Sequence, residues 1–186
     1  MSPERRKYEL KKRADAMDET RRRITEAAID LHGTVGPART TVSAVAERAG
    51  VQRHTVYRHF PTEQDLLASC SAHWGAMHPF PDPAAWTGLE QGLEELYRWY
   101  DETEEMLANI LRDAYLVEGV RDAMVPMEAF LAEARRQLSS GLPRRKTVSA
   151  AVAHAVEFRT WQSLVREGGL TRGQAARLMS ALVEAA

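Results

Sequence analysis

Two short helical segments that meet at Gly50 constrain this chain of 186 residues more than any other feature. Thr41 is a residue type that caps the N-terminus of a helix, and apolar side chains follow it at helical spacing. Gly50 stands where a helix usually passes into left-handed backbone. A second segment then runs from about Gln52 to Phe60, and Pro61 stops it. The pattern predicts a helix-turn-helix.

Small and branched apolar residues explain how the two segments pack. Ala46 allows the helices to approach closely, and Val51 and Val56 fill the angle between them. A polar face is left exposed on the second segment. Such a helix fits the major groove of DNA, where polar side chains meet base edges and phosphates. The face comprises Gln52, Arg53, His54, Thr55 and Tyr57.

The rest of the chain also has helical periodicity, so we predict an all-α fold of about nine helices. We expect a basic flexible arm over residues 1–17, a three-helix DNA-binding domain over 18–62 and a helical body over 63–186. Thr62 and Asp65 form a capping pattern for the helix that follows, and a proline-rich loop begins at His78. In the body, the predicted helices cover residues 86–101, 103–117, 121–139 and 146–167, followed by a last one capped by Thr171.

Charge is unevenly distributed along the chain. Residues 1–60 hold 13 Lys and Arg against 8 Asp and Glu, whereas the remainder holds 12 against 18. A basic head favours a polyanionic partner, although chance variation in surface charge gives the same balance. The arm can equally be a solubilising tail. Cys70 is the only cysteine, and there is no apolar run of membrane-spanning length or signal peptide, so we expect a cytoplasmic protein.

The residue patterns of common enzymes are missing. The sequence has no His-Glu-x-x-His, phosphate-binding glycine loop or Gly-x-Ser-x-Gly pattern. The histidine pairs five residues apart do not share a helix face, and the acidic run at residues 101–105 is typical of a solvated surface. We therefore expect no catalytic site, no metal site and no cofactor.

The sequence resembles the tetracycline-repressor (TetR) family. The resemblance is strongest in Thr40-Thr-Val-x-x-Val-Ala-x-x-Ala-Gly-Val and in Thr55-Val-Tyr-Arg-His-Phe-Pro, followed by Leu66-Leu67. A weaker match is Phe158-Arg-Thr-Trp-Gln-Ser-Leu-Val-Arg-Glu-Gly-Gly-Leu, near the C-terminus. The resemblance implies an all-helical homodimer that binds double-stranded DNA at a palindromic operator. It also implies a C-terminal domain for dimerisation and for a small-molecule effector that releases the DNA.

Carried over by position, the resemblance assigns DNA contacts to residues of both helices. Arg53 and His54 are expected to read bases, while Thr41, Tyr57 and His59 hold the phosphate backbone. One departure concerns Glu63, because the family often has a lysine at the start of the fourth helix. The basic arm and residues 21–23, all arginines, are expected to compensate. The DNA-contacting set is Thr41, Ser43, Gln52, Arg53, His54, Thr55, Tyr57 and His59.

Aromatic and methionine side chains in the body are candidates for a pocket that takes a small apolar or aromatic effector. The same residue types also form ordinary cores, and His154 with Glu157 can be satisfied without a ligand. The helix over 146–167 is apolar nearly all round, which indicates a second contact with a partner subunit. The ligand candidates are Trp99, Met106, Phe130, His154, Glu157 and Trp161. The dimer candidates are Phe158, Gln162, Val165, Leu178 and Leu182.

These observations predict a ligand-responsive repressor. Two alternatives stay open: a DNA-binding dimer without a small-molecule inducer, and a helical interaction scaffold that has lost DNA binding. Glu63 is the only hint of the second alternative.

Overall fold

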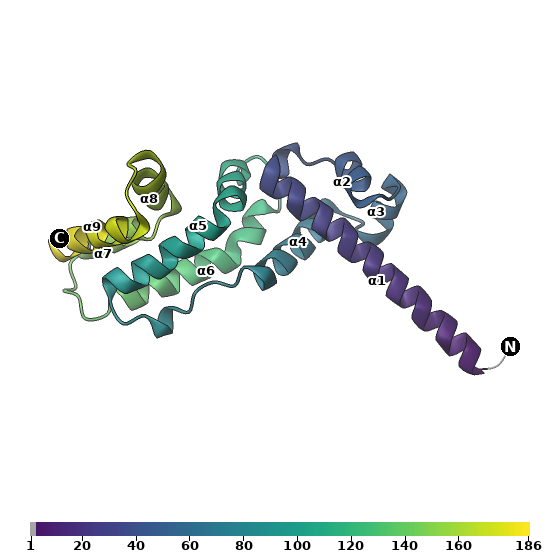
Figure 1. Cartoon of the computed structure of the whole chain (residues 1–186), viewed down its shortest axis with the longest axis horizontal. Helices are drawn as coiled ribbons and strands as arrows, with labels where there is room; N and C mark the ends of the chain where they lie inside the picture. Colours follow the sequence, from purple (N-terminus) through teal and green to yellow (C-terminus); the bar gives the residue numbers. More distant parts are fainter. Residues whose placement is uncertain (1–2) are drawn as a thin grey trace. The chain divides into compact units, whose positions relative to one another are not determined.

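The computed structural model describes the backbone of residues 3–186 and the side chains from Lys7 onward. Over that range the chain forms nine α-helices and no strand, which confirms the predicted all-α fold (Figure 1). No helix in the range is long and apolar enough to cross a membrane. The helices are α1 Pro3–Thr34, α2 Val42–Ala49, α3 Arg53–His59, α4 Glu63–Met77, α5 Leu89–Asp113, α6 Val120–Leu138, α7 Lys146–Ala155, α8 Phe158–Gln162 and α9 Arg172–Glu184.

Helix α1 corrects the expectation of a flexible N-terminal arm. Residues 3–17 continue the helix that the apolar stripe from Ile24 predicts, and in Figure 1 this part extends beyond α2, α3 and α4. The reason is local, since residues 4–32 contain neither glycine nor proline and are rich in Glu, Lys, Arg and Ala. Residues 1 and 2 of the expected arm, and the side chains of Arg5 and Arg6, lie outside the described residues.

The chain divides into two compact units. The first contains residues up to Met77 together with Glu105–Ala123, and the second contains His78–Glu104 with Met124–Ala186. Helix α4 thus groups with the helix-turn-helix, whereas the sequence analysis assigned it to the body. Leu66 and Cys70 of α4 explain the grouping, because they are buried in the core that α1, α2 and α3 build.

The second unit departs from the predicted helix boundaries in two places. The segments expected at 86–101 and 103–117 form the single helix α5, because the charged residues between them favour a helix as well as a loop. The helix expected over 146–167 is broken after Ala155, and α8 is followed by one π-helical turn at Ser163–Glu167. Pro126 lies inside α6 and does not end it.

Two buried tyrosines account for the break between α7 and α8. Tyr97 Oη donates to the carbonyl of Ala155 at 2.8 Å, and Tyr100 Oη donates to that of Val156 at 2.6 Å. Carbonyls at the end of a helix lack partners within the helix, so these phenols satisfy them. The chain can then begin α8, because the carbonyls of Ala155 and Val156 keep hydrogen-bond partners inside the core.

Candidate nucleic-acid interface

Thr41 begins α2 as the sequence predicts. Its side-chain oxygen accepts the backbone N–H of Ala44 at 3.2 Å, and its own backbone is extended. The hydroxyl proton of Thr41 is not used in this bond, so it remains able to donate to an acceptor outside the chain. Ser43 lies exposed in the first turn of the same helix. Thr41 and Ser43 therefore present polar groups to solvent where α2 starts.

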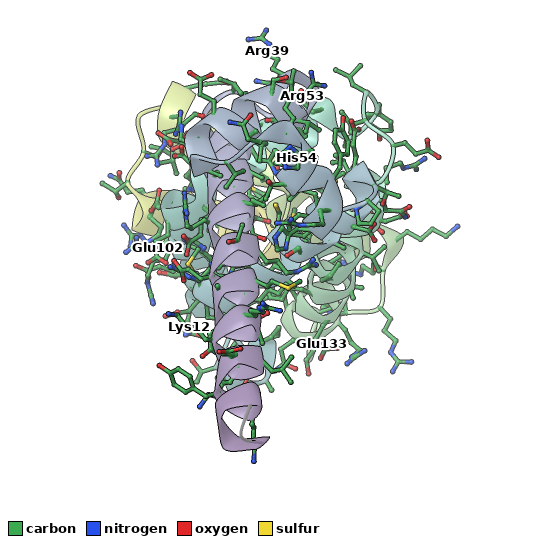
Figure 2. All side chains as sticks on the ribbon, turned by 90° about the vertical axis from the view of Figure 1, so that its right-hand side faces the viewer. Lys12, Arg39, Arg53, His54, Glu102 and Glu133 are labelled. Atoms are coloured by element: carbon green, nitrogen blue, oxygen red, sulfur yellow. The ribbon has the colours of Figure 1, made fainter. Side chains whose placement is uncertain are left out.

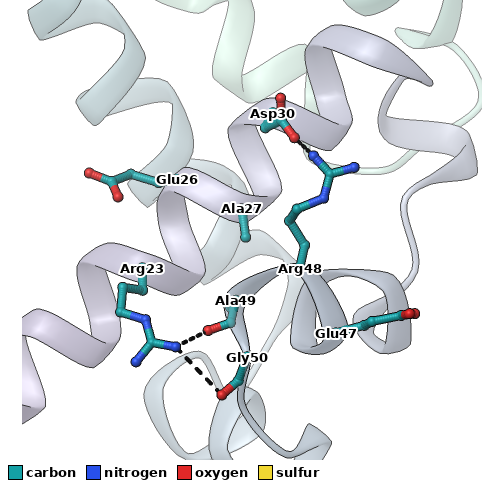
Figure 3. A pocket seen from close by; sticks show the side chains of 8 residues that line it. All are labelled: Arg23, Glu26, Ala27, Asp30, Glu47, Arg48, Ala49 and Gly50. Carbon is teal, nitrogen blue, oxygen red and sulfur yellow. Dashed lines mark hydrogen bonds and ion pairs between the residues drawn. The ribbon is translucent and has the colours of Figure 1, made fainter.

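Gly50 ends α2 in left-handed backbone, with φ of 64°. Its N–H and that of Val51 return to carbonyls of the last turn, the usual arrangement after a helix that stops at glycine. The side chain of Arg23 donates to the carbonyls of Ala49 and Gly50, as Figure 3 shows. A positive charge at the C-terminal end of a helix interacts favourably with the helix dipole. Arg23 of α1 therefore helps to hold the turn between α2 and α3 in place.

A hollow of about 420 Å³ lies beside this turn, and charged side chains of α1 and α2 line much of it (Figure 3). Arg48 pairs with Asp30 there, and Arg23 contacts the end of α2. These contacts tie α2 to α1 along one edge. The hollow is thus part of the structure that supports the turn.

Helix α3 presents most of the predicted DNA-contacting residues. Val56 is 1% exposed and anchors the helix in the core, whereas Tyr57 is 47% exposed. Gln52, Arg53 and His54 are also exposed, and Thr55 is half-buried. In Figure 2 the labelled side chains of Arg53 and His54 lie at the same end of the view. The predicted polar face of this helix is therefore present on the first unit.

His59 departs from its predicted role as an exposed phosphate contact. Its side chain is 8% exposed, and Nε2 has no hydrogen-bond partner among the described residues. Burial, followed by the nearby charges of Arg58 and Arg21, lowers the pKa of His59, so the ring is neutral at pH 7. The cause is the position of His59 in the last turn of α3, which faces α1. We therefore correct this assignment: His59 is a packing residue of the domain.

The three arginines at 21–23 were expected to supply phosphate contacts, but each has a partner in the chain. Arg21 Nη1 donates to the carbonyl of His59 at 2.5 Å, and its guanidinium lies 4.1 Å from the centre of the Phe60 ring. Arg22 forms ion pairs with Glu19 and Glu26. These arginines stabilise the domain and the C-terminal end of α3, where a positive charge is favourable.

Two exposed cations were missed by the sequence analysis. Arg39 ends the short turn Pro37–Arg39 just before Thr41, and Arg58 lies beside the exposed face of α3. Figure 2 shows Arg39 projecting outward at the same end of the view as Arg53. Only its position in the sequence could have indicated Arg39, since a basic residue directly before a helix cap lies near the N-terminus of that helix.

Glu63 is exposed in the first turn of α4, where the resemblance expected a lysine. The predicted cap is present: Asp65 N–H donates to Thr62 Oγ1 at 3.1 Å, and Thr62 N–H donates back to Asp65 Oδ2 at 3.1 Å. Acidic groups suit the positive end of the helix. The first turn of α4 thus carries two carboxylates, Glu63 and Asp65, and no lysine or arginine.

Comparison with known proteins agrees with this geometry. Residues 24–70 match the family described as "Bacterial regulatory proteins, tetR family". By this match, residues 24–70 are similar to the DNA-binding region of the TetR family of transcriptional regulators. This is a family of DNA-binding regulators and not of enzymes. The chain is 27% identical over 148 residues to the HTH-type transcriptional repressor Rv3405c of Mycobacterium tuberculosis (strain ATCC 25618 / H37Rv), covering 77% of this chain and 73% of that one.

Two further TetR-family similarities agree with the assignment. The HTH-type transcriptional regulator Mb3439c of Mycobacterium bovis has the same 27% identity over 148 residues, with 77% of this chain and 73% of the relative covered. Among solved structures, a TetR transcriptional regulator from Rhodococcus sp. RHA1 has a TM-score of 0.52 at 21% identity, covering 90% of this chain and 96% of that one. The structural match concerns the fold.

The six ligand candidates are divided between the two units. Trp99, Phe130 and Trp161 are buried in a chain of aromatic contacts in the second unit. Met106 belongs to the first unit, beside Gly33. We define the aromatic cluster of the second unit as Phe80, Trp99, Tyr100, Phe130, Phe158 and Trp161.

His154 and Glu157 are not paired on one helix face, because α7 ends between them. Both are exposed, and Glu157 Oε1 accepts from Arg135 Nη2 at 2.8 Å. They therefore do not lie on one helix face as their spacing predicts. Within the described residues, no group of three or more His, Cys, Asp or Glu is placed to hold a metal ion.

The dimer candidates separate into buried and exposed residues. Phe158 is 2% exposed and packs inside its own subunit, which excludes it from a direct contact with a partner. Leu178 and Leu182 are 41% and 53% exposed and lie one turn apart on α9. Gln162 and Val165 are half-buried.

Proposed function

We propose that this chain is a cytoplasmic TetR-family repressor that binds a palindromic operator as a homodimer and is released by a small apolar or aromatic effector. The observation that carries the DNA-binding part is the exposed polar face of α3 on a helix anchored by buried Val56. A short helix that is fixed on one side and polar on the other fits the major groove.

The exposed side chains suggest separate roles. Arg53 and His54, in the first turn of α3, are placed to read base edges, since the N-terminal part of a recognition helix contacts the bases. Tyr57, one turn further on, and Thr41 have hydroxyl groups that can donate to phosphates. Ser43, Gln52 and Thr55 lie beside these groups, and Arg39 and Arg58 add positive charge.

Helix α9 supports the proposed homodimer. Leu178 and Leu182 form an exposed apolar stripe on a helix whose adjoining side, with Met179 and Val183, is buried. Apolar side chains exposed on one helix face favour contact with another molecule. A second copy of the chain matches the symmetry of a palindromic operator.

The aromatic cluster supports an apolar effector with at least one hydrogen-bond acceptor. Trp161 is 0% exposed, and its Nε1–H has no acceptor in the part of the chain that the structure describes. Burial of an unpaired N–H group is unfavourable by about 1–3 kcal/mol, so a ligand oxygen in this region would gain that interaction. The surrounding aromatic rings favour an apolar or aromatic body for the same ligand.

A second candidate function, a DNA-binding regulator without a small-molecule inducer, is favoured by the packing of the same cluster. Phe80 and Phe130 stack with ring centroids 4.6 Å apart, and Phe158 and Trp161 lie 5.1 Å apart. Such contacts are those of a filled core. The two candidates differ only in whether the cluster opens to admit a ligand.

Selection from a random-sequence duplex library with the native chain tests the DNA-binding proposal. We expect an enriched palindrome, and we expect Arg53→Ala combined with Tyr57→Ala to weaken binding to it by about a hundredfold or more. The matched control is Arg98→Ala with Tyr115→Ala, which removes an exposed arginine and an exposed tyrosine elsewhere. Equal binding by both double variants would contradict the assigned reading face.

Thermal unfolding in the presence of small apolar acids, amides and aromatic compounds separates the two candidate functions. A ligand at about a hundred times its Kd stabilises the native state by about 2.7 kcal/mol, which raises the melting temperature. The same compound should release the operator, and Trp161→Phe should weaken its effect because the indole donor is removed. No stabilisation by any compound favours the regulator without an inducer.

A further inference from the structure

The connection between α1 and α2 determines where the first helix of the reading pair begins. It runs from Thr34 to Thr41 and includes Gly36, whose φ of 92° is a left-handed conformation. Val35 is 37% exposed, and Ala38 and Arg39 are exposed as well. Pro37 is the only buried side chain of the connection, so apolar packing alone holds it weakly in one conformation.

The C-terminal end of α5 holds the last turn of α1 and this connection through three hydrogen bonds within the first unit. Asn109 Nδ2 donates to the carbonyl of Gly33 at 2.6 Å, and Arg112 Nη2 donates to that of Val35 at 2.9 Å. Asp113 Oδ2 accepts the backbone N–H of Ala38 at 3.0 Å. Three side chains of one helix face thus contact the end of α1 and two points of the connection, at Val35 and Ala38.

These three side chains also bind one another. Arg112 Nη1 donates to Asn109 Oδ1 at 2.7 Å, and Arg112 Nε donates to Asp113 Oδ1 at 2.7 Å. The Asp113 side chain is 1% exposed, so its bonds to Arg112 and Ala38 are protected from water. A Cβ atom at Gly36 would collide with Arg112 Nη2 and Asp113 Oδ2, which explains a glycine there. We call Asn109, Arg112 and Asp113 the α5 clamp.

We propose that the α5 clamp is a positioning device that sets operator affinity without touching DNA. This inference rests on the proposed operator binding. The clamp fixes the connection, the connection fixes the first turn of α2, and α2 together with α3 forms the reading surface. When the clamp is weakened, the reading pair spends less time in the binding-competent arrangement, and the apparent affinity falls in proportion.

Substitutions at Asp113 test the proposal, because they remove a contact to the connection and change no residue of the reading face. Asp113→Leu removes the acceptor for Ala38, whereas Asp113→Asn keeps an acceptor and loses the charge that binds Arg112. The matched control is Asp122→Asn, because Asp122 is an exposed carboxylate of the same unit that accepts from Gln64 at 3.2 Å. The probes are a duplex with the palindrome selected by the native chain and a mixed-sequence duplex.

We expect operator affinity to fall by about tenfold for Asp113→Leu and by a smaller factor for Asp113→Asn, with the control unchanged. The dependence of affinity on salt concentration should keep its slope, because the residues that contact phosphates are the same. Affinities are compared per active molecule well below the melting temperature. Operator affinities within about twofold of native for both variants would overturn the proposal.

Amide hydrogen exchange gives a second readout that needs no operator. In Asp113→Asn we expect faster exchange over residues 35–45, with protection retained in α4 and in the second unit. Uniformly faster exchange throughout the first unit would mean that the clamp contributes only to stability, which overturns the positioning role. If the native chain selects no palindrome, the proposed function fails, whereas the exchange pattern still decides whether the clamp orders α2.

Discussion

The exposed polar face of α3, which we call the reading face, differs from the aromatic cluster of the second unit in its exposure to solvent. Both contain residues predicted to contact another molecule. Gln52, Arg53, His54 and Tyr57 are exposed on a helix that contributes Val56 to the core. Trp99, Phe130 and Trp161 are at most 8% exposed and contact other rings. Exposed polar groups on an anchored helix indicate a partner, whereas buried aromatic groups are equally consistent with plain packing.

The difference shows which residue types indicate a binding site. Polar side chains on a short helix have no packing role, so their pattern carries information about binding. Aromatic side chains in a helical body fill a core whether or not a ligand visits it. The predictions below test whether the two regions differ in function as they differ in exposure.

The largest expected effect is on formation of the homodimer, because α9 of the second unit also exposes side chains that can contact a partner. Replacement of Leu178 and Leu182 by glutamate should weaken the homodimer by more than about a thousandfold, since a two-fold interface would lose four leucines at roughly 1.5 kcal/mol or more each. Sedimentation at micromolar concentration should show a folded monomer with little operator affinity. The control is Leu116→Glu with Val125→Glu, which changes two other exposed apolar residues. A dimer in both variants would show that α9 is not the interface.

Short-range signals explain how much of the fold could be predicted. Thr41, Gly50 and Thr171 act on neighbouring backbone groups, and each ends or starts a helix where the sequence indicates. The same is true of the Thr62 cap of α4. These signals fix both ends of α2 and the start of α4. They therefore also place α3, which lies between them and carries the reading face.

Long-range contacts explain what could not be predicted. The end of α7 depends on Tyr97 and Tyr100, which lie 58 and 56 residues away in sequence from the carbonyls they bind. His59 matches the family pattern, but its burial depends on α1 and on Arg21, 38 residues earlier. Neither contact leaves a local pattern, so the helix break between His154 and Glu157 and the burial of His59 could not be predicted.

Mild acid should affect the first unit through its buried histidine on α1. Burial lowers the pKa of His32 from 6.5 to about 4. The folded state resists protonation of His32, so acid destabilises it. The free energy of unfolding is unaffected by this group above pH 6.5 and falls as the pH drops towards 4, by about 2.5 kcal/mol at pH 4.5. Denaturant unfolding at pH 7 and 4.5 measures this loss, and His59 contributes in the same direction.

His32→Gln separates this contribution from that of other groups. The variant should be less dependent on pH between 6.5 and 4.5 than the native chain, whatever its stability at pH 7. His154→Gln is the control, because His154 is exposed in the second unit. Equal pH dependence in all three proteins would show that His32 does not titrate as its burial implies.

The tyrosine contacts at the end of α7 should contribute to the stability of the second unit and not to DNA reading. Tyr100→Phe leaves the buried carbonyl of Val156 without its 2.6 Å donor, which lowers the unfolding free energy by about 1–2 kcal/mol. Tyr97→Phe has a similar effect at Ala155. The control Tyr115→Phe removes a hydroxyl that is well exposed to solvent, so its effect should stay within about 0.5 kcal/mol. Losses of equal size in all three variants would contradict the proposed role of these phenols.

The smallest expected effect concerns residues 7–17 of the helical extension, which are largely exposed like the reading face and include no buried core residue. Lys11 and Lys12 are exposed, and Leu10 and Met17 beside them are more than half exposed. If the extension lies along DNA, Lys11→Gln with Lys12→Gln should lower operator affinity a few-fold and reduce the slope of log affinity against log salt by about 1–2. Stability should not change, since these side chains bury little surface. Lys146→Gln, an exposed lysine of the second unit, should leave the slope unchanged. An unchanged slope in the Lys11 and Lys12 variant would confine the interface to α2, α3 and the turn before them, and would show that exposure without an anchor does not make a binding face.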